Sequence, residues 1–213
     1  MTARETDETN DHIVRAYIAY SRFMAVLAFL LPVALLLSGF IVDDRSLKDS
    51  LSDYYHGVDL QRNLFVGTLC AVAAFLALYK GLRGVEANLL NVAGVSAVFV
   101  AFIPTPEEEN GFFSGHGVAA FTLFGCIIVV GVVLPWIKKK LGRAAATPPL
   151  VGYAVSAAIM VVGALLAVLG KLRFPDSRAF LLGEVFLVAG FGIFWWIRTR
   201  HLSQPSVRRL LLD

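Results

Sequence analysis

The stretch FMAVLAFLLPVALLLSGFIV (residues 23–42) decides the fold. It contains no Asp, Glu, Lys or Arg, and a helix needs about 20 mainly apolar residues to cross the hydrocarbon core of a bilayer. The segment before it (residues 1–22) is polar and carries both signs of charge, whereas a cleavable signal peptide has a short basic start. We therefore predict an uncleaved first membrane span. Within the tail, Ile13, Tyr17 and Tyr20 have helical spacing, which suggests an interfacial helix over residues 11–22.

Five further apolar runs follow this span, at residues 64–79, 88–103, 113–137, 150–170 and 179–197. The chain of 213 residues is 57% hydrophobic and 16% charged, while soluble domains carry about 25% charged residues. The predicted fold is all-α, with six transmembrane helices in an antiparallel bundle over residues 23–198. Residues 1–22 and 199–213 are the predicted tails. Cys70 and Cys126 lie inside spans and suggest no disulfide framework.

The basic residues predict the orientation, because cytoplasmic flanks of membrane spans carry the excess of Lys and Arg. Most of the 19 basic residues fall in the two tails and in the second and fourth connections, which include the run Lys138–Lys140. Six fall on the other side: Arg45, Lys48, Arg62, Lys171, Arg173 and Arg178. We expect both termini to be cytoplasmic, and we expect the protein to reside in the plasma (inner) membrane. This distribution follows topology, so the net charge of +3 does not indicate a nucleic-acid partner.

Several polar residues are expected to share one depth on the outer side. Asp53 and His56 belong to the stretch SLSDYYHG (residues 50–57), and His116 follows Ser114, a candidate N-cap, at the start of the fourth span. Glu184 lies five residues into the last span, about 7–8 Å along a helix. An ionisable group inside a span is energetically costly, so Glu184 is a candidate functional residue. The alternative for Glu184 is an ion pair with Arg178 or contact with the nearby surface.

Two histidines and two carboxylates allow three roles. His56, His116, Asp53 and Glu184 could ligate a metal such as zinc. They could perform acid–base chemistry at a lipid headgroup. They could also form a static hydrogen-bond network that closes the outer end of the bundle.

The order of these features resembles a known group of membrane proteins. SLSDYY (residues 50–55), NLLNVAGVSAVFVAFIPT (88–105), FFSGHGVAAFTLFG (112–125) and GEVFLVAGFGIFWW (183–196) resemble the DRAM/Frag/Sfk group of six-span proteins. The resemblance picks out Ser52, Asp53 and His116, with Glu184 as a looser match, and it implies a link to lipid remodelling. A more distant likeness is to the alkaline ceramidase/progestin-receptor (CREST) superfamily of membrane hydrolases. Its members have seven spans and a His pair in the last, where this chain has Glu184.

Together these features lead to one expected function and two alternatives. The first is a membrane-embedded lipid-modifying hydrolase or transferase, in which Ser52, Asp53, His116 and Glu184 act on membrane lipids. The second is a non-enzymatic sensor or scaffold with a membrane-protein partner or a second copy of itself. The third is a small proton-coupled transporter with Glu184 as the titrating group, although no internal repeat supports it.

Overall fold

The computed structural model describes residues 3–42, 47–79, 84–105, 114–140, 149–174 and 178–204. Every element in these ranges is helical, which confirms the all-α prediction. The helices are α1 (Ala3–Val42), η1 (Ser52–His56), α2 (Asp59–Leu78), α3 (Val85–Phe102), α4 (Gly115–Ile128), η3 (Val129–Val133), α5 (Leu134–Lys140), α6 (Leu150–Arg173) and α7 (Ala179–Leu202).

Within the described ranges, six helical stretches are long and apolar enough to cross a membrane, as predicted. They are Val14–Val42, Asp59–Leu78, Val85–Phe102, Gly115–Ile137, Leu150–Arg173 and Ala179–Leu202. Large apolar side chains such as Phe29, Val155 and Leu165 stay exposed on the outside of the bundle. A lipid-facing surface accounts for them, because acyl chains are as apolar as these side chains. The chain is an integral, multi-pass membrane protein.

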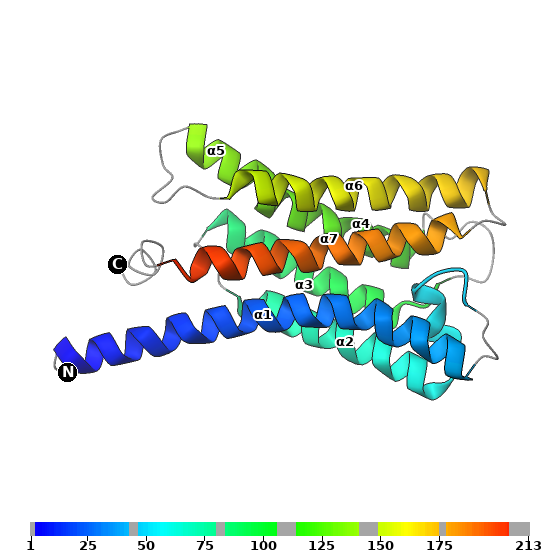
Figure 1. Cartoon of the computed structure of the whole chain (residues 1–213), viewed down its shortest axis with the longest axis horizontal. Helices are drawn as coiled ribbons and strands as arrows, with labels where there is room; N and C mark the ends of the chain where they lie inside the picture. Colours follow the sequence, from blue (N-terminus) through cyan, green and yellow to red (C-terminus); the bar gives the residue numbers. More distant parts are fainter. Residues whose placement is uncertain are drawn as a thin grey trace.

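The helices lie side by side along one long axis (Figure 1). Helix α7 packs between α6 and α1, α1 also contacts α2, and α3 packs between α2 and α4. We call the end of the bundle where α1 begins and α7 ends the terminal end, and the opposite end the distal end. Helix α1 is unbroken from Ala3 to Val42, so residues 11–22 continue the first span rather than forming a separate helix.

Small residues allow the closest helix contact, between α6 and α7. A Cβ on Gly183 would lie 2.5 Å from the backbone nitrogen of Ala167. One on Gly163 would lie 2.7 Å from the carbonyl oxygen of Gly183. Small residues are the usual means by which membrane helices approach closely, since dispersion contacts replace the hydrophobic effect there.

The fourth span changes its winding at η3, which is a single π-helical turn. Pro135 follows two residues later and has no N–H for the carbonyl of Gly131, and its ring would crowd that carbonyl in a regular helix. Local π geometry is one way in which membrane helices accommodate proline. The span therefore remains continuous from Gly115 to Ile137.

Candidate functional site

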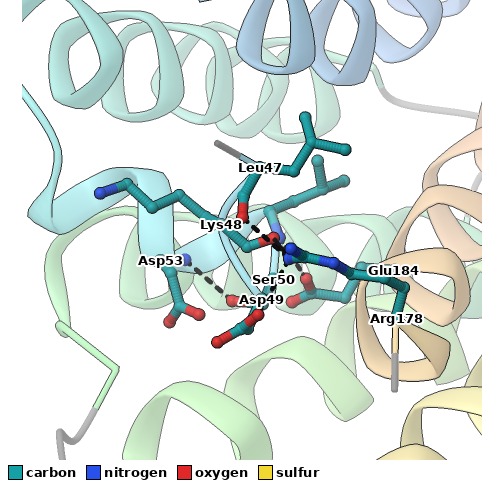
Figure 2. Close-up of polar contacts among 8 residues, drawn as sticks. Leu47, Lys48, Asp49, Ser50, Asp53, Arg178 and Glu184 are labelled. Carbon is teal, nitrogen blue, oxygen red and sulfur yellow. Dashed lines mark hydrogen bonds and ion pairs between the residues drawn. The ribbon is translucent and has the colours of Figure 1, made fainter. Parts of the chain in front are cut away.

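Glu184 is bonded to the segment that precedes α2 at the distal end. Residues 47–57 of that segment contain η1, and its Leu51 and Ser52 are buried. The Leu51 N–H donates to Glu184 Oε2 at 2.5 Å, and Ser52 Oγ donates to Glu184 Oε1 at 3.0 Å. Figure 2 shows the Glu184 carboxylate directed at this segment from α7. Both carboxylate oxygens are thus occupied by neighbouring residues of one loop.

Ser50 extends this hydrogen-bonded chain within the segment. Its hydroxyl lies 3.0 Å from that of Ser52 and accepts from the backbone N–H of Asp53 at 2.9 Å. The serine pair therefore links the Glu184 carboxylate to the first turn of η1. A helix start leaves backbone N–H groups without intrahelical partners, and Ser50 satisfies one of them.

The histidines bond to the other elements at the distal end. His56 Nε2 lies 3.1 Å from both the carbonyl oxygen and the hydroxyl of Thr105. The Thr105 hydroxyl donates to Asp53 Oδ1 at 3.3 Å. His116 Nδ1 lies 2.8 Å from the carbonyl oxygen of Ile103, just beyond α3. Each imidazole thus has a main-chain oxygen among its partners.

Arg178 does not pair with Glu184, which was one expectation from the sequence. Its Nη1 donates to the carbonyl oxygens of Leu47 and Lys48, at 2.8 and 3.1 Å, and to Asp49 Oδ1 at 2.9 Å (Figure 2). The Arg178–Asp49 ion pair is exposed to solvent. Arg178, the N-cap residue of α7, and Glu184, in the second turn of that helix, therefore both bind the segment 47–57.

Ser114 caps α4 as predicted, since its hydroxyl accepts from the Gly117 N–H at 3.2 Å. This cap fixes the start of the helix on which His116 lies, and His116 itself is buried.

The predicted site residues come together only in part. Ser52 meets Glu184 directly, and Asp53 meets His56 through Thr105. His116 contacts the carbonyl oxygen of Ile103 instead of these side chains. In the described ranges, no group of three or more His, Cys, Asp or Glu side chains is placed to hold a metal ion. The residues expected as zinc ligands, His56, His116, Asp53 and Glu184, do not fit a zinc ion in this arrangement.

A second polar cluster, which was not predicted from the sequence, lies near the terminal end. Arg198 Nη2 of α7 donates to Glu86 Oε1 of α3, and Arg198 Nε donates to the Tyr79 hydroxyl at 3.1 Å. The two charged side chains are only 6% and 4% exposed. A buried pair of this kind is strongly destabilised when one partner is removed, because the remaining charge is left without compensation.

Aromatic rings surround this buried pair. The Tyr79 ring packs edge-on against Trp195 and Tyr17, with centroid distances of 5.1 and 5.3 Å. Burial raises the pKa of the Tyr79 phenol, against the lowering effect of the neighbouring Arg198 guanidinium. The phenol therefore stays protonated at neutral pH, with a lone pair that accepts from Arg198.

The sequence contained one indication of this cluster. The last predicted span ends at residue 197 and the third begins at residue 88, so Arg198 and Glu86 both lie just outside the predicted spans. The structure starts α3 at Val85 and continues α7 to Leu202. Opposite charges at the ends of two spans that meet the same membrane face are a pattern that could have predicted the pair.

No protein family, characterised protein or solved structure matches this chain. The resemblance to the DRAM/Frag/Sfk group therefore stays a prediction. The geometry of the two polar clusters is therefore the evidence that bears on function.

Proposed function

We propose that this chain is a non-enzymatic membrane protein of the sensor or scaffold class, whose distal polar cluster holds residues 47–57 in a fixed position. One observation carries the proposal: both oxygens of Glu184 accept hydrogen bonds from the adjacent residues Leu51 and Ser52. We also propose that both termini are cytoplasmic in the plasma (inner) membrane, on the support of the Lys and Arg distribution. The distal end then faces outward and presents its fixed segment to a partner.

The other contacts at the distal end favour the same function. Arg178 holds the start of the segment through two main-chain carbonyls. His56 and His116 bond to the main chain just beyond α3. Ser52 is only 3% exposed, so a substrate would have to displace the segment in order to reach it.

The substitution Glu184→Gln tests the proposal. Gln keeps the size of the side chain, but its NH2 group then faces one of the two loop donors, and a buried donor without an acceptor costs about 1–3 kcal/mol. We expect a lower unfolding temperature and amide exchange at residues 50–53 that is faster by roughly tenfold or more. Asp59→Asn is the matched control, because Asp59 is an exposed carboxylate at the same end and forms a surface ion pair with Arg62.

Lipid composition provides the second half of this test. Proteoliposomes of phosphatidylethanolamine, phosphatidylglycerol and cardiolipin should keep their lipid composition over time with the wild-type protein. Conversion of any of these lipids by the wild type, together with its loss in Glu184→Gln, would refute the non-enzymatic function.

A lipid-modifying enzyme is the second candidate, and the contact between Ser52 Oγ and Glu184 Oε1 favours it. In such an enzyme the Ser52 oxygen would bond to an ester carbonyl carbon while its proton passed to Glu184. The ester C–O bond would then break, and the alcohol part of the lipid would leave with that proton. Water would later hydrolyse the acyl–Ser52 ester and release a fatty acid. This function predicts that Ser52→Ala abolishes lipid turnover even where the fold is retained. A shift to a covalently acylated form of the wild type, absent in Ser52→Ala, would be its mass-spectrometric signature.

A further inference from the structure

Two shallow grooves meet on the outside of α1 at its terminal half. The first lies near the terminal end and is lined by Arg15, Ile18, Ala19, Arg22, Phe23 and Val26. The second lies between α1 and α7 and is lined by Ala25, Val26, Phe29, Ile193 and Trp196. Val26 lines both, so the two form one continuous surface, which we call the α1–α7 groove.

The groove is basic at one end and apolar at the other. Arg15 and Arg22 are seven residues apart, which places them on the same side of the helix. The Arg200 guanidinium lies 5.6 Å from the centre of the Trp196 ring and adds a third positive charge beside the groove. Beyond Arg22 the lining is apolar, and Trp196 is 47% exposed.

The length of the first span explains this polarity. Val14–Val42 contains 29 residues, about 44 Å of helix at 1.5 Å per residue, whereas the hydrocarbon core is about 30 Å thick. The first turns of this stretch therefore extend into the headgroup layer. Arg22 and Phe29 are separated by about 10 Å along α1, so the groove runs from headgroup depth into the acyl-chain region.

We propose that the α1–α7 groove binds one anionic phospholipid from the leaflet at the terminal end. Its phosphate would lie against Arg15 and Arg22, since guanidinium groups make strong, geometrically matched hydrogen bonds to phosphate oxygens. One acyl chain would follow Val26 to Phe29 and Trp196. The charge and the apolar lining both suit such a lipid, because basic surfaces between membrane helices recognise anionic headgroups.

Trp196 provides a reporter for this lipid. In the background Trp136→Phe, the remaining tryptophans are Trp195 and Trp196, and Trp195 is only 1% exposed. Full-length protein is placed in nanodiscs of phosphatidylcholine with a variable fraction of phosphatidylglycerol, and one of the two lipids carries bromine on its acyl chains. We expect brominated phosphatidylglycerol to quench Trp196 at a mole fraction on the order of tenfold lower than brominated phosphatidylcholine.

The double substitution Arg15→Gln/Arg22→Gln should remove this preference and bring the ratio close to one. The matched control Arg62→Gln/Arg173→Gln removes two exposed arginines from the distal end and should leave the ratio unchanged. Val26→Phe narrows the junction of the two grooves without changing charge and should weaken quenching by both lipids.

Four results would overturn the proposal. The wild type could be quenched equally by both lipids, or the Arg15→Gln/Arg22→Gln protein could keep the preference. The Arg62→Gln/Arg173→Gln control could lose the preference to the same extent, which would indicate a general surface-charge effect. Protection of Trp196 that depends on protein density and not on headgroup would assign the groove to a second copy of the chain.

Discussion

At the residue scale, the distal cluster shows how one carboxylate inside a span is made tolerable. Glu184 accepts hydrogen bonds from a backbone N–H and from a serine hydroxyl. Both donors belong to the segment 47–57, so the same two bonds attach that segment to α7. Counting residues along the last span predicted that Glu184 lies at the same membrane depth as Asp53 and His56, in the stretch that also holds Ser52. That the backbone of Leu51 is a partner could not be predicted, because every non-proline residue carries the same N–H.

A first prediction compares two buried serines. Ser52→Ala removes a hydrogen bond to a residue 132 positions away, and a buried acceptor that loses a donor costs about 1–3 kcal/mol. Ser38→Ala is the control, since Ser38 bonds only to the Leu35 carbonyl of its own helix. Thermal unfolding in detergent should show the larger loss for Ser52→Ala. Equal effects would mean that the bond to Glu184 contributes nothing specific.

At the element scale, α7 makes two contacts that help to fix its position in the bundle. One is its close approach to α6, and the other is its buried ion pair with α3. Close helix packing could be predicted from the small residues in these spans, because glycine lets the backbones of two membrane helices approach closely wherever they meet. The ion pair was not predicted, because Arg198 and Glu86 each look like ordinary interfacial charges until both helices are extended by a turn.

The α6–α7 contact predicts a strong effect of one methyl group. Gly183→Ala places a Cβ 2.5 Å from a backbone atom of α6 that cannot move by side-chain rotation, so we expect a loss at or above the usual 1–3 kcal/mol of overpacking. Gly125→Ala is the control, since a Cβ there meets nothing within 4 Å. That control should be neutral or stabilising by up to about 1 kcal/mol, through helix propensity. Similar unfolding temperatures for both variants would contradict the close approach.

The buried pair predicts a non-additive double substitution. Glu86→Leu and Arg198→Met alone should each cost about 3–5 kcal/mol, because each leaves a charge without its partner. The double variant Glu86→Leu/Arg198→Met should recover much of this loss, since an apolar pair of similar volume needs no compensation. Chemical unfolding followed by circular dichroism measures the cycle. Strict additivity of the two losses would show that the charges do not depend on each other.

At the scale of the whole molecule, the described residues contain six candidate spans, and the start of α1 and the end of α7 lie at the same end of the bundle (Figure 1). The count and approximate positions of the spans were predictable, because the apolar run needed to cross a bilayer is a local property of sequence. The orientation of the bundle is a prediction from charge alone. It determines which polar cluster faces which compartment.

Labelling of single cysteines tests that orientation. In a chain with Cys70 and Cys126 replaced by Ser and Ala, His56→Cys should react with a membrane-impermeant maleimide added to intact cells. Lys139→Cys, which is exposed near the terminal end, should react only after the membrane is opened. The reverse pattern would place the distal cluster in the cytoplasm and reverse the proposed topology.

Both polar clusters can form only after α7 has been synthesised, because each contains a residue of that helix. Helix α7 is made after the other five described spans, and it supplies Glu184 to one cluster and Arg198 to the other. Glu86 precedes Arg198 by 112 residues, about 6–22 s of translation at 5–20 residues per second. During that interval the partly made chain holds an uncompensated carboxylate at the membrane. Insertion of α7 therefore completes both polar clusters at once, and we expect a chain that stops before α7 to be degraded by membrane quality control.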